Sequence, residues 1–293
     1  MGEVSGEVHR EIGRNRLRRP LGWIAAGLVL MLAGGVAIQA RRDTMADPIE
    51  RTISIPLPGL SRQAAPLRIL LLSDIHVGDP DMSADRAARI VERLNRLHPD
   101  MVLIAGDFIS DKWLLPRHYS FARAIAPLAG LHAPLGTVAV LGNHDYQEGA
   151  PAAQAALQRL GIRVLRNEAM RLGPLTIGGL GDHYNNDTDS PATLAAMRRL
   201  GPPYVLLGHE PDSFIDLPRE FPLMMAGHTH CGQISLPLIG PIITGSHYGR
   251  RYVCGLVREH GARLIVTAGL GTSDLPIRLG AHGDVWLITL TPG

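Results

Sequence analysis

Short apolar runs alternate with amphipathic stretches through the chain beyond residue 66. Three apolar runs are each followed by a stretch of helical periodicity: 67–73 then 83–98, 101–105 then 117–129, and 137–141 then 151–160. Buried strands of a parallel sheet are near-continuous apolar runs, and strands that alternate with helices are typical of α/β folds. The pattern therefore predicts an α/β domain that begins near residue 67.

Apolar runs dominate the second half of the chain, where the stretch near 191–200 is the one with helical periodicity. Strands are expected at 175–180, 204–207 and 223–226. Further candidates lie at 232–236, 251–257, 263–267 and 284–290. We expect these last strands to form a second sheet.

The longest apolar run lies near the N-terminus and carries no charge. It covers residues 20–40, and as an α-helix these 21 residues span about 30 Å, the thickness of a bilayer's hydrocarbon core. We therefore predict a transmembrane helix or signal anchor. A cleaved signal peptide and a weak twin-arginine signal are the alternatives, although the run is long for the first, and Pro20 and Gly22 fit the second poorly.

Arginines on both sides of this run predict how the chain crosses the membrane. Residues 1–19 form a basic tail with five arginines, and Arg41 and Arg42 follow the run. By the positive-inside rule the tail is expected in the cytoplasm and the rest of the chain on the other face. The Arg41–Arg42 pair keeps the opposite topology open. Residues 41–66 are expected to form a linker, in which alternating apolar residues permit an edge strand.

Composition narrows the function and compartment only slightly. The chain has 293 residues and a formal net charge of +2, so it shows no nucleic-acid signature. Its two cysteines, Cys231 and Cys254, are either small packed residues or a disulfide in an oxidising compartment, and sequence does not set the distance between them. The oligomeric state is not predicted.

Polar side chains follow five of the predicted strands at the point where each strand ends. They are Asp74 with His76, Asp107, Asn143, His209, and His228 with His230. The carboxyl ends of strands are where α/β folds place their chemistry, and imidazole, carboxylate and amide groups together suit divalent ions such as Mn, Fe or Zn. We predict two divalent ions that share the carboxylate of Asp107, because a carboxylate offers two oxygens.

Residues next to Asn143 are candidates for catalysis. His144 follows this candidate ligand directly, so it is expected beside the metals as a general acid for the leaving group, or as a cation that stabilises transition-state charge. Asp145 could orient the imidazole of His144. His183 lies in a polar loop after the strand at 175–180, where it either lines the substrate cleft or is solvated.

The motifs Asp-x-His, Gly-Asp, Gly-Asn-His-Asp, Gly-His and Gly-His-x-His resemble those of the calcineurin-like metallophosphoesterases, complete and in order. The resemblance covers residues 67–293, and the segments 228–233 and 268–278 resemble a membrane-associated bacterial branch. It implies a four-layer αββα sandwich and a metal-bound hydroxide that attacks a phosphoester. It also implies two ligand sets: Asp74, His76, Asp107 and His230 for one ion, and Asp107, Asn143, His209 and His228 for the other.

The resemblance therefore implies a metal-dependent phosphoric ester hydrolase on a membrane anchor, and the arginine pattern puts its catalytic domain on the non-cytoplasmic face. UDP-2,3-diacylglucosamine pyrophosphatases of lipid A assembly share the fold and suit a membrane protein, but their substrate is made inside the cell. A non-catalytic scaffold of the same fold would be expected to lack ligands, above all at Asp107, Asn143 or His144, and none is missing. Sequence does not distinguish a monoester, a diester or a pyrophosphate as the substrate.

Overall fold

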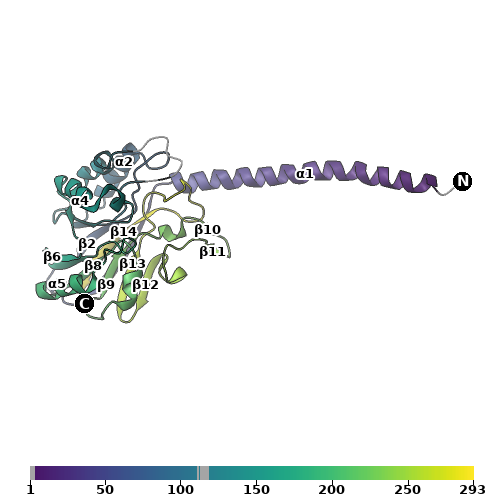
Figure 1. The fold of residues 1–293 in the computed structure, drawn as a ribbon. Helices are drawn as coiled ribbons and strands as arrows, with labels where there is room; N and C mark the ends of the chain where they lie inside the picture. The colour runs from purple at the N-terminus through teal and green to yellow at the C-terminus, as the bar shows by residue number, and fades with distance from the viewer. Residues whose placement is uncertain (1–3, 111, 113–118) are drawn as a thin grey trace. The chain divides into compact units, whose positions relative to one another are not determined.

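The chain divides into two compact units, residues 1–42 and residues 43–293. The computed structural model describes residues 4–110, 112 and 119–293, with side chains from residue 23 onward (Figure 1). Of residues 41–66, expected as a linker, those from 43 onward belong to the same compact unit as residues 67–293.

A single long helix, α1 (Val4–Met45), accounts for the first unit and continues into the first residues of the second. Its apolar side chains are largely exposed, as for Trp23 at 79% and Leu30 at 73%. By length and composition the segment Trp23–Met45 could cross a membrane. An exposed apolar helix of this length is what a bilayer would cover, although a signal sequence has the same properties.

The first sheet of the second unit has six strands in the order β1-β14-β2-β3-β4-β5. Their bounds are Ile49–Leu57 for β1, Asp284–Pro292 for β14, Leu67–Leu72 for β2, Met101–Ala105 for β3, Thr137–Val140 for β4 and Arg163–Val164 for β5. The pairing of β14 with β2 is antiparallel, and the other pairings are parallel. The carboxyl ends of β2, β3 and β4 therefore lie side by side at one edge of the sheet.

Strand β14 was expected in the second sheet, and that prediction was wrong. It lies in the first sheet, where Ile288 pairs with Ile53 of β1 and with Ile69 of β2. Val285 packs on the helices that cover this sheet, whereas Ile288 packs between the two sheets. An apolar run identifies a strand buried on both faces, but it does not identify the strand's neighbours.

The second sheet also has six strands, in the order β12-β13-β9-β8-β7-β6. Their bounds are Gly255–Glu259 for β12, Ala262–Val266 for β13, Leu223–Ala226 for β9, Tyr204–Leu207 for β8, Leu175–Gly179 for β7 and Glu168–Leu172 for β6. The pairings inside the sheet, from β13 to β7, are parallel, and the two outer pairings are antiparallel.

Two expected strands differ from the structure. The segment 232–236 forms only the short β10 (Ser235–Leu236), which pairs with β11 (Gly240–Pro241) in a hairpin. In place of a strand at 251–257, a 3-10 turn precedes β12. Glycines with positive φ, Gly232 at 80° and Gly255 at 79°, interrupt the extended backbone at both places.

Helices cover the outer faces of the two sheets and complete a helix–sheet–sheet–helix order (Figure 1). The helices are α2 (Ala84–Asn95), α3 (Phe121–Ile125), α4 (Ala150–Arg159) and α5 (Ser190–Leu200). Side chains of α2, α3 and α4 share one apolar cluster with the first sheet, and α5 shares another with the second sheet. A third cluster fills the space between the sheets. This confirms the predicted four-layer αββα fold.

The helix expected at 117–129 is shorter than predicted. The α-helix ends at Ile125 and a 3-10 turn, Ala126–Gly130, follows it. Pro127 explains the change, because proline lacks the N–H that an α-helix needs and clashes with the preceding turn. Residues 117 and 118 lie outside the described residues.

We expect Asp284→Ala to destabilise the second unit, residues 43–293. The buried carboxylate of Asp284 accepts hydrogen bonds from Thr267 Oγ1 at 2.6 Å and from the Ala268 N–H at 2.8 Å. Buried donors left without partners cost about 1–3 kcal/mol each, so the free energy of unfolding should fall by about 2–5 kcal/mol. Urea unfolding of the full chain in detergent measures it. Asp47→Ala, which removes a mostly exposed partner of Arg93, is the control and should change stability little.

Candidate metal centre

The seven predicted ligands all follow strands whose carboxyl ends point to one region between the sheets. Asp74 and His76 follow β2, Asp107 follows β3 and Asn143 follows β4 in the first sheet; His209 follows β8, and His228 and His230 follow β9 in the second sheet. The structure brings all of them together, and their assignment as metal ligands stays a prediction.

Left-handed backbone follows β2, β3 and β9, where it directs the candidate ligands toward one another. The positive φ angles are 47° at Asp74, 46° at His76, 56° at Asp107, 69° at His228 and 51° at His230. For residues other than glycine, such backbone conformations cost about 1–3 kcal/mol each and cluster at functional sites. The strain at the predicted ligands therefore marks this region as a functional site independently of the motifs.

Glycines next to the candidate ligands let the chain segments approach closely. A Cβ atom on Gly106 would lie 2.5 Å from the backbone nitrogen of Gly142 and 2.8 Å from Nδ1 of His209. A Cβ atom on Gly142 would lie 2.7 Å from the backbone nitrogen of Asp107. The glycines of the Gly-Asp and Gly-Asn motifs are thus required for the close packing of these chain segments, while the Asp and Asn are the candidate ligands.

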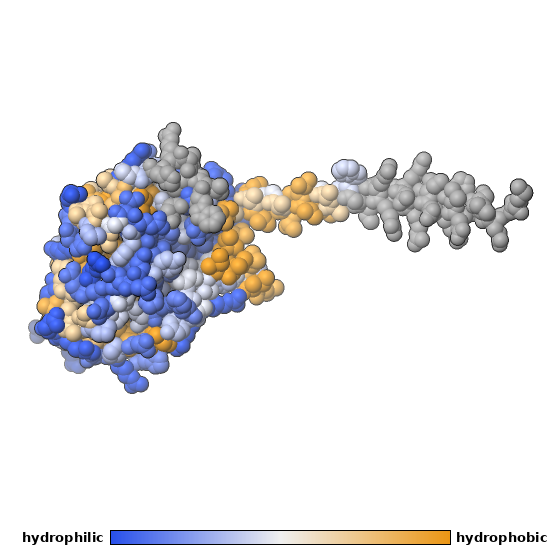
Figure 2. Space-filling model, viewed as in Figure 1, coloured by the Kyte–Doolittle hydropathy of each residue, from blue (hydrophilic) through white to orange (hydrophobic). Residues whose placement is uncertain are grey.

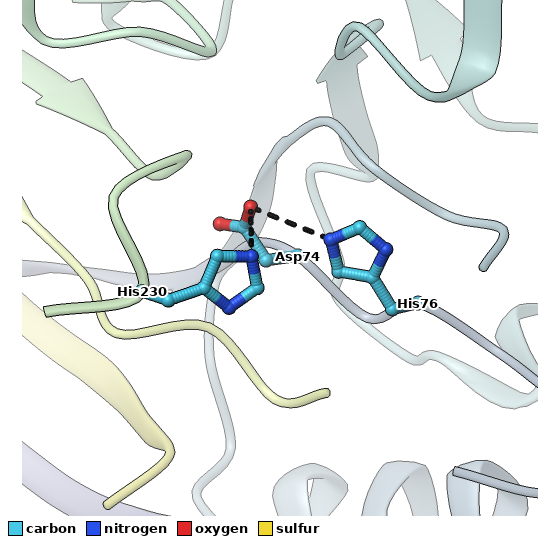
Figure 3. Close-up of side chains that lie close together, drawn as sticks. All are labelled: Asp74, His76 and His230. Atoms are coloured by element: carbon cyan, nitrogen blue, oxygen red, sulfur yellow. Dashed lines mark ion pairs between the residues drawn. The ribbon is translucent and has the colours of Figure 1, made fainter. Parts of the chain in front are cut away.

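Asp74, His76 and His230 form one group of donors (Figure 3). Oδ1 of Asp74 lies 3.3 Å from Nε2 of His230 and 3.9 Å from Nε2 of His76. Oδ2 of Asp107 lies 3.3 Å from the same His76 nitrogen. These atoms surround a common point, as the ligands of one ion would.

Asp107, Asn143, His209 and His228 form a second group. Oδ2 of Asp107 lies 3.3 Å from Nε2 of His209. Oδ1 of Asn143 lies 3.1 Å from the same His209 nitrogen and 3.1 Å from Nδ1 of His228. Asp107 is therefore common to both groups, and one of its oxygens faces both.

The donor atoms fit divalent metal ions. Oδ1 of Asp74 and both ring nitrogens of His76 are buried without a hydrogen-bond partner. Buried polar atoms are usually hydrogen-bonded, so these buried atoms next to one another suit a bound cation. Nδ1 of His209 lies 2.6 Å from the carbonyl oxygen of Ala105, and a proton on Nδ1 would leave Nε2 free as a ligand. Imidazole, carboxylate and amide donors together suit Mn, Fe or Zn.

Burial and neighbouring charges keep His228 and His230 neutral. Burial, with the charge of His209 next, lowers the pKa of His228 to about 4. Burial, with His76 and Arg278 next, lowers the pKa of His230 well below its usual range. Burial opposes the charge on Asp107, but His209 and His144 outweigh it and hold the pKa of that carboxyl well below its usual range. His228, His230 and Asp107 are thus in the ionic forms that bind metals. Burial lowers the pKa of His209, but the charge of Asp107 outweighs it and holds the pKa of that imidazole well above its usual range, so an ion would have to displace a proton from His209.

Asp145 supports the turn that carries Asp107. Its Oδ2 accepts hydrogen bonds from the backbone N–H groups of Asp107 and Gly142, both at 2.9 Å, and its Oδ1 accepts one from Phe108 at 2.8 Å. Burial and the nearby charge of Asp107 raise the pKa of Asp145 to about 7. This role in positioning Asp107 was not foreseen from the sequence, because it depends on backbone groups 37 and 38 residues away.

His144 lies at the edge of the centre, where a leaving group could reach it. Its Nε2 is 3.9 Å from Oδ2 of Asp107 and 3.4 Å from Oγ of Ser273, and its side chain is 11% exposed. It lines a cavity of about 340 Å³ together with Asn143, His228 and His230. The cavity gives a substrate direct access to the donor atoms of both groups.

A neighbouring cavity of about 390 Å³ contains the loop residue His183, together with His228 of the centre. His183 therefore lines a cleft, and its predicted part in substrate binding stays a prediction. Asp212 and His247, which the sequence did not indicate, line the same cavity and are in hydrogen-bond contact, with Oδ2 of Asp212 2.8 Å from Nδ1 of His247. No motif contains them, so only the fold could identify them.

Arg278 and a disulfide fix the segments around His230. The buried guanidinium of Arg278 donates to the carbonyl oxygens of Ala268 and Gly271, both at 2.6 Å. Burial lowers the pKa of Arg278 to about 10. Cys231, directly after His230, forms a disulfide with Cys254, and their Cα atoms are 4.7 Å apart. The disulfide that the sequence left open is therefore present in the structure.

Residues 67–232 match the sequence model of a family described as calcineurin-like phosphoesterase. An uncharacterised metallophosphoesterase of Bacillus subtilis is 32% identical over 94% of this chain and 96% of its own length. An uncharacterised metallophosphoesterase of Helicobacter pylori is 30% identical over 77% of this chain and 60% of its own length. A Danio rerio protein named transmembrane protein with metallophosphoesterase domain is 28% identical over 90% of this chain and 62% of its own length.

We expect Asp107→Ala to lose both metal ions, because it removes the oxygen that faces both donor groups. Metal content of the purified full chain, measured by mass spectrometry, should fall from two ions toward none. Asp85→Ala, at an exposed position in the first turn of α2, is the matched control and should keep the wild-type metal content. Two ions retained by a folded Asp107→Ala protein would contradict the shared position of Asp107.

Proposed function

Because the chain belongs to the calcineurin-like phosphoesterase family, we propose that it hydrolyses a phosphoester at a centre of two divalent ions. The observation that carries the proposal is that Oδ2 of Asp107 lies 3.3 Å from Nε2 of both His76 and His209. One carboxylate between donors from two sheets suits a ligand shared by two ions. The proposed ligand sets are Asp74, His76, Asp107 and His230 for one ion, and Asp107, Asn143, His209 and His228 for the other.

The charge balance of the proposed ligands favours an anionic substrate. When bound, the ions would supply Lewis acidity toward phosphoryl oxygens and an activated water as nucleophile. Asp74 and Asp107 bring two negative charges against four positive charges of two divalent ions. Asn143 is neutral where an aspartate could also be a ligand, so it preserves the positive excess. This excess would hold the phosphate group at the mouth of the cavity.

His144 is proposed to donate a proton to the leaving oxygen. Its partial exposure and its place in the cavity wall leave Nε2 within reach of a bound ester. Asp145 acts indirectly, because its hydrogen bonds hold the backbone turn that positions Asp107.

We expect the full chain in detergent, supplied with Mn, Fe or Zn, to hydrolyse aryl phosphates, aryl phosphodiesters or sugar-nucleotide lipids. With an alkyl leaving group, His144→Ala should keep its metals while kcat falls about 10²–10⁴-fold, the usual loss for a missing general acid. The loss should be smaller with nitrophenolate, a leaving group that needs little protonation. His132→Ala, at an exposed loop position, is the control.

Two results would separate the alternatives. If the metal-loaded chain hydrolyses none of these esters, a non-catalytic scaffold becomes the better hypothesis for its function. If His144→Ala affects both leaving groups equally, the proton-donor role is wrong even though the chain is an enzyme.

The disulfide supports a catalytic domain on the non-cytoplasmic face of the membrane. Disulfides persist in oxidising compartments and are rare in the cytosol. Cys231–Cys254 therefore favours the same topology as the five arginines ahead of the apolar helix. This topology also argues against a UDP-2,3-diacylglucosamine pyrophosphatase, whose substrate is made in the cytoplasm.

We expect alkaline phosphatase, which is active only outside the cytoplasm, to be active when fused after Gly293. Green fluorescent protein exported through the same pathway in an unfolded state should be dark at that position. The reverse result would place the catalytic domain in the cytoplasm and raise the nucleotide-lipid pyrophosphatase to first place.

A further inference from the structure

Four apolar side chains project from the β10–β11 hairpin and the residues after it. This apolar lip consists of Leu238, Ile239, Ile242 and Ile243, which are 108%, 56%, 57% and 75% exposed. Hydrophobic residues gather at the edge of the domain where the hairpin lies (Figure 2). Isolated exposed apolar residues are common, but a contiguous group marks a binding surface for protein or membrane.

The sequence around the lip is free of formal charge. Between His230 and Arg250 the chain has no Asp, Glu, Lys or Arg. A loop that remains in water usually carries such residues, since they keep exposed hairpins soluble and unpaired. Protein interfaces usually have a polar and charged rim around their apolar centre, whereas a lipid interior penalises every charge. The uncharged lip therefore fits a lipid surface better than a protein partner.

The lip is linked by hydrogen bonds to the point where the chain enters the catalytic domain. The Gly280 N–H donates to Oδ2 of Asp43 at 2.8 Å. The Ser235 N–H, at the base of the hairpin, donates to the carbonyl oxygen of Leu279 at 2.8 Å. Asp43 belongs to the last turn of α1 and to the compact unit of the catalytic domain. The residue at which α1 joins the domain is therefore linked to the base of the hairpin through Leu279 and Gly280.

The lip is also continuous with the wall of the catalytic cavity. Ile242 and Ile243 line the cavity of about 340 Å³ together with His144 and His228. The same wall includes Leu275, which is 43% exposed. An apolar path thus leads from the lip to the donor atoms of the centre. A small hydrophilic phosphoester would not need an apolar path to reach these donor atoms.

We propose that the apolar lip inserts into the bilayer that α1 crosses, and that the centre acts on a phosphoester carried by a lipid whose acyl chains stay in that bilayer. The substrate class rests on the phosphoester hydrolysis proposed above, whereas the insertion does not. The lipid's chains would lie against the lip while its phosphate reaches the metal centre along the Ile242–Ile243 wall.

Insertion is tested on the full chain reconstituted into phosphatidylcholine vesicles with or without bromine on the acyl chains. Leu238→Trp places a fluorophore at the tip of the lip, and Leu200→Trp places one at a remote exposed leucine at the end of α5. After subtraction of the wild-type signal, brominated lipid should quench the tryptophan at position 238 at least twofold and leave the one at 200 unchanged. Equal quenching at the two positions would overturn the insertion.

The substrate class is tested with two esters that share one scissile bond, para-nitrophenyl methyl phosphate in solution and para-nitrophenyl dioleoylglyceryl phosphate in vesicles. The variant combines Leu238→Ser with Ile239→Ser, two residues outside the cavity wall, and Leu200→Ser is the control. The lip variant should lose about tenfold or more of kcat/KM on the lipid ester, because two apolar side chains no longer enter lipid. Its activity on the methyl ester should match wild type, and the control should match on both.

The outcomes distinguish this inference from the proposed function. Cleavage of the methyl ester without cleavage of the lipid ester overturns the lipid substrate and leaves phosphoester hydrolysis standing. Equal activity of the lip variant and wild type on the lipid ester also overturns it, and would leave the lip as a contact for a protein or a second copy. Cleavage of neither ester by the metal-loaded chain refutes the lipid diester as substrate, whereas the earlier hydrolysis screen decides the proposed function itself.

Discussion

The contact between Asp107 and His209 holds the carboxyl ends of the two sheets together. Oδ2 of Asp107, after β3, lies 3.3 Å from Nε2 of His209, after β8. The other nitrogen of the same imidazole lies 2.6 Å from the carbonyl oxygen of Ala105, the last residue of β3. Both ring nitrogens of His209 therefore contact residues of the first sheet or of the turn that follows its strand β3. Without Gly106 the ring could not sit there, since any Cβ at that position would lie 2.8 Å from Nδ1.

This close meeting explains why the backbone around the centre is strained. Five candidate ligands have positive φ, at a cost of about 1–3 kcal/mol each. The three backbone hydrogen bonds accepted by Asp145 and the buried apolar cluster between the sheets oppose that cost. These contacts hold the candidate ligands in place through the packing of the protein itself, and an ion bound there would add to the stability of the folded domain.

Sequence predicted those parts of the fold that local pattern determines. Apolar runs located the strands that precede Asp74, Asp107 and His209, and the residues after each strand located the candidate ligands. The position of β14 could not be predicted, because its partners are set by pairing across more than 200 residues of chain. The positioning role of Asp145 depends in the same way on backbone groups that only folding brings near it.

The apolar lip shows a second limit of prediction from sequence patterns. The segment 232–236 was expected to be a strand of the second sheet, since an apolar run does not reveal whether protein or lipid covers it. The structure gives it two residues of strand and leaves the apolar side chains that follow exposed. Local chemistry was therefore easier to predict from sequence than the environment in which each residue lies.

One short turn connects the chemistry of the centre to the lip. His230 provides a candidate ligand, Cys231 next to it is bonded to Cys254, and Gln233 holds Ser273 through both its amide oxygen and its amide nitrogen. The hairpin begins only after these attachments. A displacement of the lip at a membrane surface would therefore have to break the hydrogen bonds between Gln233 and Ser273 before it reached His230. The disulfide and the Gln233 hydrogen bonds fix the turn that carries His230. A change at the lip would therefore leave the position of His230 next to Asp74 and His76 unaltered.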